Sequence, residues 1–217
     1  MRVLAADPGG HLVSHVALVG ISGRVGSRVA AELLRRGHSV TGIARNIDAV
    51  PARPGLVVKS ADATQPGILA PILRGHAAVV SAMRFVGGIT APALIAAAKH
   101  AGIKRVLVVG GAGSLLIAPG VALIDSPDFP AAYKAEAAAG RFFLDALRTE
   151  PELDWSFLSP SALLEPGERT GRFRLGGDEL LIDVQGKSRI SMEDYAIALV
   201  DELENPRHIR RRFTVGY

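Results

Sequence analysis

From residue 15 onward, short runs of β-branched and other apolar residues alternate with longer segments rich in alanine and leucine. The short runs, each four to six residues long, lie at 16–20, 39–44, 56–60, 77–82, 105–110, 155–159 and 213–216. The segments that predict helices lie at 24–36, 64–74, 90–101, 131–148 and 192–204. Continuously apolar strands separated by helices are typical of a parallel sheet that is buried on both faces. The pattern therefore predicts a doubly wound α/β fold.

Three segments depart from this alternation. Residues 1–14 are expected to be a flexible N-terminal extension, which leaves 15–217 as a single domain. Residues 106–124 carry no charge, but their glycines and Pro119 favour a strand followed by a loop over a membrane helix. Residues 170–190 contain four glycines around FRL and LLIDV and predict a small hairpin-like insertion for the substrate. After it, Ser191 and Asp194 have the spacing of a capping box.

Composition narrows the possible chemistry. The 217 residues are 48% hydrophobic, which suffices for one sizeable core and excludes collagen, coiled coil and disorder. Because cysteine is absent, disulfides, thiolate metal sites and cysteine nucleophiles are excluded, and the expected location is the cytoplasm. His11 and His15 have i, i+4 spacing but lack a third ligand, so no metal site is predicted.

The net charge of +4 raises the question of a polyanionic partner. The one dense basic cluster is RHIRRRF at 207–213, and no aromatic residues are interleaved with its arginines. We expect this cluster to be a solvated edge, and we predict neither a nucleic-acid nor a membrane partner. The expected state is a monomer or a homodimer.

The strongest chemical signal is a glycine-rich turn after the first strand. Gly20, Gly23 and Gly26 form a G-x-x-G-x-x-G run between a strand and a helix, inside a βαβ unit. In such turns one glycine makes the tight bend, another lets the backbone approach a pyrophosphate, and a third allows close helix packing. The N–H groups of the first helical turn, which includes Val25, would face the phosphates. The turn predicts dinucleotide binding by a Rossmann-type fold; the alternative is a turn that serves packing alone.

The end of the second strand bears on the choice of cofactor. An acidic residue there would hold the ribose 2′-hydroxyl of NAD, whereas an arginine can hold the 2′-phosphate of NADP. The sequence has Arg45 and Asn46 at this point, and Ser22 and Arg24 in the glycine turn can join them around a phosphate. NADP(H) is therefore favoured over NAD(H). The alternative is that both arginines are simply solvated.

At this point the chain resembles the atypical short-chain dehydrogenase/reductases of the NmrA-like and NADH-flavin reductase type. The similarity spans nearly everything after residue 15 and rests on several strings. Besides the glycine turn, these are SADAT, VVSAM, VLVVGGAGSL, DFPAAYKAEA, WSFLSPSALLEPGERTGRFRLGG, RISMEDYAIALVDELE and RFTVGY. Together they are typical of this group rather than of Rossmann folds at large.

The resemblance implies roles for individual residues. Asp62 and Ala63 would border the adenine. The adenosine ribose would be bordered by Ser81, Ala82 and Met83. The nicotinamide half would lie beside Gly110, Gly111 and Ala112. The loop from Pro160 to Leu163 would cover the nicotinamide, and Lys134 would reach its ribose. From the residues alone, Asp62 is equally well explained as a helix N-terminal residue.

The sequence also departs from the group. Typical short-chain dehydrogenases place a tyrosine four residues before the lysine. The positive charge of the lysine lowers the pKa of the tyrosine hydroxyl, so that this hydroxyl can exchange a proton with the substrate. Here that position is Pro130, and the neighbouring Tyr133 would point about 100° away from Lys134 on a helix. Tyr195 has no lysine four residues later, and Ser114 is a candidate for the serine of such sites. Ordinary alcohol and ketone dehydrogenation is therefore in doubt.

Two functions remain open. In the first, the protein is an NADPH-dependent reductase that delivers hydride to a small planar acceptor such as a flavin or quinone, with Lys134, Ser114 and Tyr133 as candidate catalytic residues. Its substrate pocket would be walled by residues 111–133 and 160–177. In the second, the protein is a non-catalytic NADP(H)-binding redox sensor, which the missing Tyr-x-x-x-Lys favours.

Overall fold

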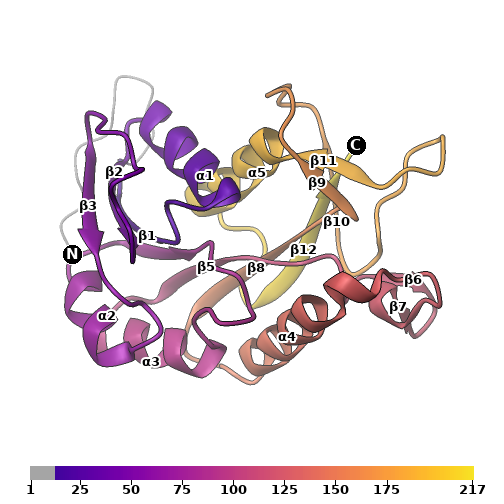
Figure 1. Cartoon of the computed structure of the whole chain (residues 1–217), viewed down its shortest axis with the longest axis horizontal. Coiled ribbons are helices and arrows are strands. Elements are labelled where there is room, and N and C mark those ends of the chain that lie inside the picture. Colours follow the sequence, from indigo (N-terminus) through magenta and orange to yellow (C-terminus); the bar gives the residue numbers. More distant parts are fainter. Residues whose placement is uncertain (1–12) are drawn as a thin grey trace.

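Eight strands form the central sheet of the computed structural model, which describes residues 13–217 (Figure 1). Their order is β10-β12-β8-β5-β4-β1-β2-β3, and all neighbours are parallel except β10, which is antiparallel to β12. The strands are β1 (His15–Val19), β2 (Ser39–Ala44), β3 (Leu56–Ser60), β4 (Ala78–Ser81), β5 (Arg105–Val109), β8 (Asp154–Pro160), β10 (Arg174–Gly176) and β12 (Arg211–Gly216). Because the order reverses between β1 and β4, a crevice is expected at their carboxyl ends.

Helices cover both faces of this sheet (Figure 1). They are α1 (Arg24–Arg35), α2 (Pro66–Leu73), α3 (Ala91–Ala101), α4 (Ala131–Arg148) and α5 (Met192–Glu204). α1 and α5 pack on one face, and α2, α3 and α4 on the other. Each begins and ends within two residues of its predicted bounds. The predicted doubly wound Rossmann-type fold is confirmed.

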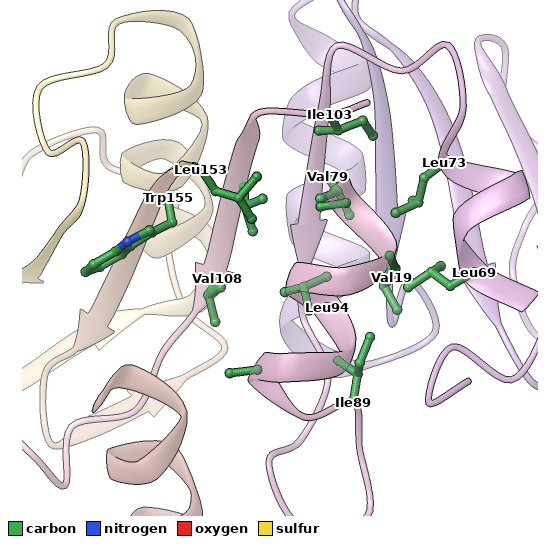
Figure 2. Packing of buried hydrophobic residues seen from close by; sticks show 14 of the residues in the cluster. Val19, Leu69, Leu73, Val79, Ile89, Leu94, Ile103, Val108, Leu153 and Trp155 are labelled. Atoms are coloured by element: carbon green, nitrogen blue, oxygen red, sulfur yellow. The ribbon is translucent and has the colours of Figure 1, made fainter. Parts of the chain in front are cut away.

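The two cores explain why the strands are continuously apolar. In β1, Val16 and Leu18 pack with α1 and α5, whereas Ala17 and Val19 pack with the other three helices. Figure 2 shows the second of these cores, in which Val19 and Val79 of the sheet lie beside Leu69 of α2 and Leu94 of α3. Since successive side chains of a strand point to opposite faces, a strand buried on both sides cannot alternate with polar residues.

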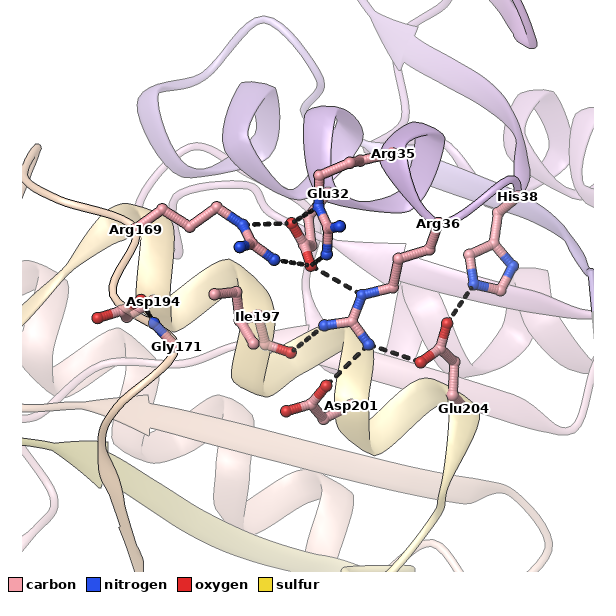
Figure 3. Close-up of polar contacts among 10 residues, drawn as sticks. All are labelled: Glu32, Arg35, Arg36, His38, Arg169, Gly171, Asp194, Ile197, Asp201 and Glu204. Carbon is pink, nitrogen blue, oxygen red and sulfur yellow. Dashed lines mark hydrogen bonds and ion pairs between the residues drawn. The ribbon is translucent and has the colours of Figure 1, made fainter. Parts of the chain in front are cut away.

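A partly buried ion-pair network joins α1 to α5 and to the loop that follows β9 (Leu163–Glu165) (Figure 3). Glu32 of α1 is only 4% exposed and accepts hydrogen bonds from Arg35, Arg36 and Arg169 at 2.7–3.0 Å. Arg36 also pairs with two carboxylates of α5. Burial alone would raise the pKa of Glu32, but the three arginines hold it well below its usual range.

The segment 170–190 differs from the predicted hairpin. β10 pairs with β12 rather than with residues 180–184, which form no strand. Further on, β11 (Arg189–Ser191) pairs in parallel with β9. The prediction of internal pairing is wrong because the outer edge of β12 offers unpaired backbone groups, and the segment extends the main sheet there by one strand.

The uncharged segment 106–124 forms the predicted strand and loop. After β5, the chain makes a short antiparallel pair, β6 (Leu116–Ala118) and β7 (Val121–Ala122), and then a 3₁₀ turn at Leu123–Asp125. The segment from β10 to β12 touches this loop, because the N–H of Leu116 donates to the carbonyl oxygen of Asp178 at 2.8 Å. No helix within residues 13–217 is long and apolar enough to cross a membrane.

Two polar contacts fix the amino end of α5. The hydroxyl of Ser191 accepts the N–H of Asp194 at 3.0 Å, as the capping spacing predicts. The carboxylate of Asp194 does not return to Ser191, as a full capping box requires. It instead accepts the hydroxyls of Thr170 and Tyr217 and the N–H of Gly171. Asp194 therefore anchors the loop after β9 and the last residue of the chain to α5.

The basic cluster 207–213 is only partly solvated. Arg207 and Arg211 are exposed, as expected for a solvated edge. The side chain of Arg212, however, is 3% exposed and pairs with Asp178, so the expectation is wrong for this residue. Its position in β12 directs it toward the loop after β5, where a carboxylate from the segment before β11 neutralises it.

Candidate active site

The glycine turn has the geometry that close packing and ligand approach require. Gly20 adopts a φ of +88°, and a Cβ there would lie 2.7 Å from the carbonyl oxygen of Ala82 after β4. A Cβ on Gly26 would collide with the backbone of Gly20. The N–H of Gly23 donates to the carbonyl oxygen of Gly20 at 3.0 Å. A side chain at Gly20 or Gly26 would therefore push the turn away from β4 or α1 away from β1.

The amino end of α1 is open to an anion. Gly23 precedes the helix, and none of the described side chains caps it. The first turn, which includes Arg24, Val25 and Gly26, contains no acidic residue. The unpaired N–H groups and the positive end of the helix dipole are therefore available for a phosphate.

Two arginines beside this turn carry unpaired charge. Arg24 and Arg45 are exposed, and no carboxylate among residues 13–217 forms an ion pair with either. By contrast, Arg28 on the next turn of α1 pairs with Glu193 at 2.9 Å. Ser22 is exposed, and the side-chain oxygen of Asn46 is occupied by the N–H of residue 48. Arg24 and Arg45 thus lie beside the glycine turn without a carboxylate in ion-pair contact, although the charge of Arg45 contributes to lowering the pKa of Asp62.

The residues after β3 and β4 occupy mixed environments. Asp62 accepts both the N–H and the hydroxyl of Thr64, at 3.0 and 2.7 Å, and these bonds lower its pKa. A local turn therefore accounts for Asp62 without a ligand. Ala63 and Ser81 are buried. Ala82 and Met83 are half-buried beside the glycine turn.

A pocket of about 590 Å³ opens at the carboxyl end of β5. Its walls come from the loop after β5, the first turns of α4, and the end of the β8–β9 connection. Most of the lining side chains are apolar or aromatic. The members used below are Phe85, Gly110, Gly111, Ser114, Phe129, Tyr133, Glu136, Gly140 and Leu163. Residues of the predicted wall 111–133 line this cavity, but of the predicted wall 160–177 only Ala162 and Leu163 do. Residues between Glu165 and Arg172 line a separate pocket, so the second prediction holds only in part.

The candidate hydroxyl groups are placed differently from one another. Ser114 is half-buried in the pocket wall, and Arg212 donates to its hydroxyl from behind at 3.5 Å. Tyr133 also lines the pocket and is 65% exposed. The hydroxyl of Tyr195 is buried, donates to Leu158 at 2.6 Å and accepts the N–H of Gly110 at 3.2 Å. Burial raises the pKa of Tyr195, so this phenol stays protonated and supports the sheet.

Lys134 and Pro160 do not line this pocket. Lys134 is exposed on the first turn of α4, and it has no ion-pair partner within the described part of the chain. Pro160 is buried at the end of β8, so the following Ala162 and Leu163 form the wall instead.

Sequence reasoning missed several residues of the pocket, and two of them are important below. Phe85, in the loop after β4, and Glu136, on α4, were not among the predicted site residues. Both oxygens of Glu136 accept backbone N–H groups, from Phe85 at 2.7 Å and Val86 at 3.0 Å. The available signal was the spacing of Tyr133, Glu136 and Gly140 on α4, which share one helix face.

The fold, the glycine turn and the adjoining pocket define a Rossmann-type dinucleotide-binding protein. Residues 20–206 match the NAD(P)H-binding family, and the chain belongs to this family. The expected membership of the atypical short-chain dehydrogenase/reductases is confirmed by this match and by the similarities that follow.

Relatives resemble the chain over nearly its whole length. The uncharacterized protein YwnB of Bacillus subtilis (strain 168) is 37% identical over 209 residues, which are 92% of this chain and 97% of YwnB. A candidate exported protein of Burkholderia pseudomallei is 48% identical with a TM-score of 0.86 and covers 94% of this chain and 100% of its own. A candidate NADH-flavin reductase of Streptococcus pneumoniae TIGR4 is 33% identical with a TM-score of 0.82 and covers 94% and 99%.

Proposed function

We propose that the protein is an NADPH-dependent reductase that transfers a hydride to a small planar acceptor of the flavin or quinone type. The observation that carries this proposal is the position of an apolar pocket at Gly110–Ser114, on the same strand-end edge of the sheet as the glycine turn. A dinucleotide held at α1 through its phosphates would extend along that edge toward the pocket at the end of β5. The name of the Streptococcus pneumoniae relative supports the acceptor class.

The residues present fit a bound NADP(H). The glycine turn and the uncapped α1 suit the pyrophosphate, and the unpaired Arg24 and Arg45 suit a 2′-phosphate. When bound, the reduced nicotinamide supplies the hydride. The backbone of Gly110 and Gly111 is proposed to lie beside the nicotinamide, and Lys134 is proposed to reach its ribose. A side chain at Gly110 would collide with Phe157, so this glycine holds the end of β5 close to the core. The resemblance further assigns adenosine contacts to Asp62, Ala63, Ser81, Ala82 and Met83, and Pro160 to the cover of the ring.

The pocket places few proton donors near an acceptor. Ser114, Ser126 and Tyr133 are the hydroxyl-bearing residues in its wall, and none of them has a lysine in the arrangement that lowers a phenol pKa. Tyr195 is committed to the sheet. We therefore assign Ser114 or Tyr133 to polarising the acceptor, and we propose an acceptor that takes its proton from water. Flavins and quinones meet this condition.

Cofactor preference is tested by removing Arg45. We expect Arg45→Ala to raise the Kd for NADPH by about tenfold and to leave the Kd for NADH within twofold, because only NADPH carries the 2′-phosphate. The matched control is Arg74→Ala, an exposed arginine after the carboxyl end of α2. Equal effects of Arg45→Ala on both cofactors in titration calorimetry would refute the preference.

The second candidate is a non-catalytic NADP(H)-binding redox sensor. It is favoured by the missing Tyr-x-x-x-Lys and by the position of Lys134 outside the pocket wall. NADPH oxidation at 340 nm with flavins, quinones and small aldehydes, alongside equilibrium binding of NADPH, separates the two. Tight binding without oxidation by any acceptor supports the sensor. Turnover that is abolished by Lys134→Ala but not by Arg211→Ala supports the enzyme.

We also propose that the protein works in the cytoplasm, as a monomer or homodimer without a nucleic-acid partner. Arg210 and Arg212 of the basic cluster are engaged by contacts within the chain, so less of its positive charge is free to bind a polyanion. This supports the absence of a nucleic-acid partner. The name of the Burkholderia pseudomallei relative makes export the alternative. Fractionation of cells that express the full chain distinguishes the compartments.

A further inference from the structure

One carboxylate ties the loop after β4 to α4. Glu136 lies on the second turn of α4, and its side chain is 30% exposed. One of its oxygens accepts the N–H of Phe85 at 2.7 Å and the other accepts the N–H of Val86 at 3.0 Å. Its other neighbour is the exposed Arg84, at 3.9 Å. Because both oxygens are held by the backbone of one loop, Glu136 fixes where that loop lies against α4.

This loop carries an aromatic ring into the pocket. Phe85 stacks on Phe157 with ring centroids 6.1 Å apart and packs against Phe143 at 5.3 Å. Phe143 and Phe157 are buried beneath, so Phe85 is the member of this aromatic group that lines the pocket. Its ring lies 3.8 Å from the place of a Cβ on Gly111, at the end of β5.

A glycine in the middle of α4 makes room for the ring. A Cβ on Gly140 would lie 3.0 Å from two ring atoms of Phe85. Glycine is unfavourable in a helix interior compared with alanine, so local helix preference does not explain its presence. Close packing of the Phe85 ring on the backbone of α4 does explain it.

We propose that Phe85 is the specificity-determining residue of the pocket, a ring on which a planar acceptor stacks, and that Glu136 is its positioning residue. This inference rests on the proposed reductase function, and it names the feature of the acceptor that the site selects, namely an extended aromatic face. Aromatic rings attract one another when their centroids lie about 4.5–7 Å apart, as Phe85 and its two neighbours already do. An acceptor above Phe85 extends this stack by one ring.

The first test compares ring substitutions at Phe85. We expect Phe85→Leu to raise the KM for menadione and for FMN by about two- to tenfold, the range that ring stacking contributes, with kcat reduced less than twofold. Phe85→Tyr keeps the ring and is expected to retain the wild-type KM. The Kd for NADPH and the Tm of both variants check that the fold and cofactor site are intact. Equal KM values for the Leu and Tyr variants would overturn the role of the ring.

The second test concerns the positioning role of Glu136. Glu136→Gln keeps the shape of the side chain but replaces one acceptor oxygen by an NH₂ group, which cannot accept a hydrogen bond. One of the two hydrogen bonds to the loop is therefore lost. We expect it to raise the same KM values, and the double variant with Phe85→Leu to be no worse than Phe85→Leu alone. Asp145→Asn removes a carboxylate on α4 that pairs with Arg148, and is the control. Additive effects in the double variant would show that Glu136 does not act through Phe85.

Direct binding keeps this inference separate from the proposed function. Fluorescence anisotropy of oxidised FMN is measured with wild type and Phe85→Leu in the presence of NADP⁺. If wild type binds FMN but reduces no acceptor, the reductase proposal fails, and weaker binding by Phe85→Leu still supports the stacking role. If wild type reduces menadione or FMN and Phe85→Leu matches it, only the stacking role fails. If wild type neither binds nor reduces any planar acceptor, both fail.

Discussion

At the amino end of α1, Arg24 is exposed and has no ion-pair partner among the described residues, whereas at the carboxyl end Arg35 and Arg36 share Glu32 with Arg169. One helix thus carries two kinds of arginine. Charges that hold the fold are saturated by carboxylates and partly withdrawn from water. The arginines that are proposed to hold a ligand form no ion pair with a carboxylate, and the phosphate of the ligand would supply the missing negative charge. The lack of an ion pair is shared by other exposed arginines such as Arg74, so it is the position of Arg24 and Arg45 beside the glycine turn that sets them apart.

The largest expected effect is at the saturated end. Glu32→Ala leaves three arginines without their shared acceptor, and we expect it to lower the free energy of unfolding by about 3 kcal/mol in urea titrations at pH 7. The Kd for NADPH should stay within twofold, because the binding end of α1 is not touched. Glu152→Ala, at a side chain that is 72% exposed, is the control and should cost less than about 0.5 kcal/mol. A loss for Glu32→Ala no larger than the control would contradict the structural role of the network.

The next effect is at the open end of α1. Gly26→Ala places a methyl group against the backbone of Gly20, so α1 must move away from β1. Overpacking of this kind costs about 1–3 kcal/mol, which we expect to appear as roughly 5- to 150-fold weaker NADPH binding in calorimetry. Gly67→Ala in α2 is the matched control, because no atom lies within 4 Å of the added Cβ. Unchanged NADPH affinity of Gly26→Ala would remove the turn from the binding site.

The smallest expected effect concerns the pH dependence of stability and two histidines at the amino ends of the central strands. The rings of His15 and His76 lie 4.0 Å apart, and Nε2 of His76 is buried without a hydrogen-bond partner. Burial lowers the pKa of both, and Lys59 lowers them further. The unfolded chain therefore takes up protons below about pH 6.5 that the folded chain does not, and stability falls as the pH drops through that value.

Urea midpoints measured between pH 8 and pH 5 check this expectation. The contribution of Glu32 persists over this range, because its pKa is held far lower. A decline below pH 6.5 that is flattened by His76→Gln supports the histidine pair as the cause. A midpoint that does not change across the range contradicts it.

Local sequence signals predicted most of the fold. The alternation of apolar runs and helical segments depends on neighbouring residues, and it placed every helix and the seven parallel strands. The glycine turn was predictable for the same reason, since Gly23 and Gly26 pack against Gly20 within one βαβ unit. The further contact of Gly20 with Ala82 after β4 is long-range. Structural features that depend on residues close together in the chain can be predicted from a single sequence.

Long-range pairings were not predictable in this way. Arg212 is buried because Asp178 reaches it, and Glu136 is occupied because the loop of Phe85 lies beside α4, about fifty residues away in sequence. The segment 170–190 has the composition of a hairpin, yet the free edge of β12 decided its pairing. In each case the outcome depended on which distant group lay opposite. The candidate site is therefore predictable on its cofactor side and much less so on its acceptor side.

The pairing of β10 with β12 also affects how molecules can aggregate. A row of unpaired backbone groups at a sheet edge is a template for strands of other chains, and very short edge strands weaken that template. β10 has only three residues, while the opposite edge strand β3 has five and exposes Val57. Within the central sheet of residues 13–217, strand-to-strand association is therefore expected at β3 rather than at β10, and two copies joined at β3 would leave only the short β10 edges of their central sheets.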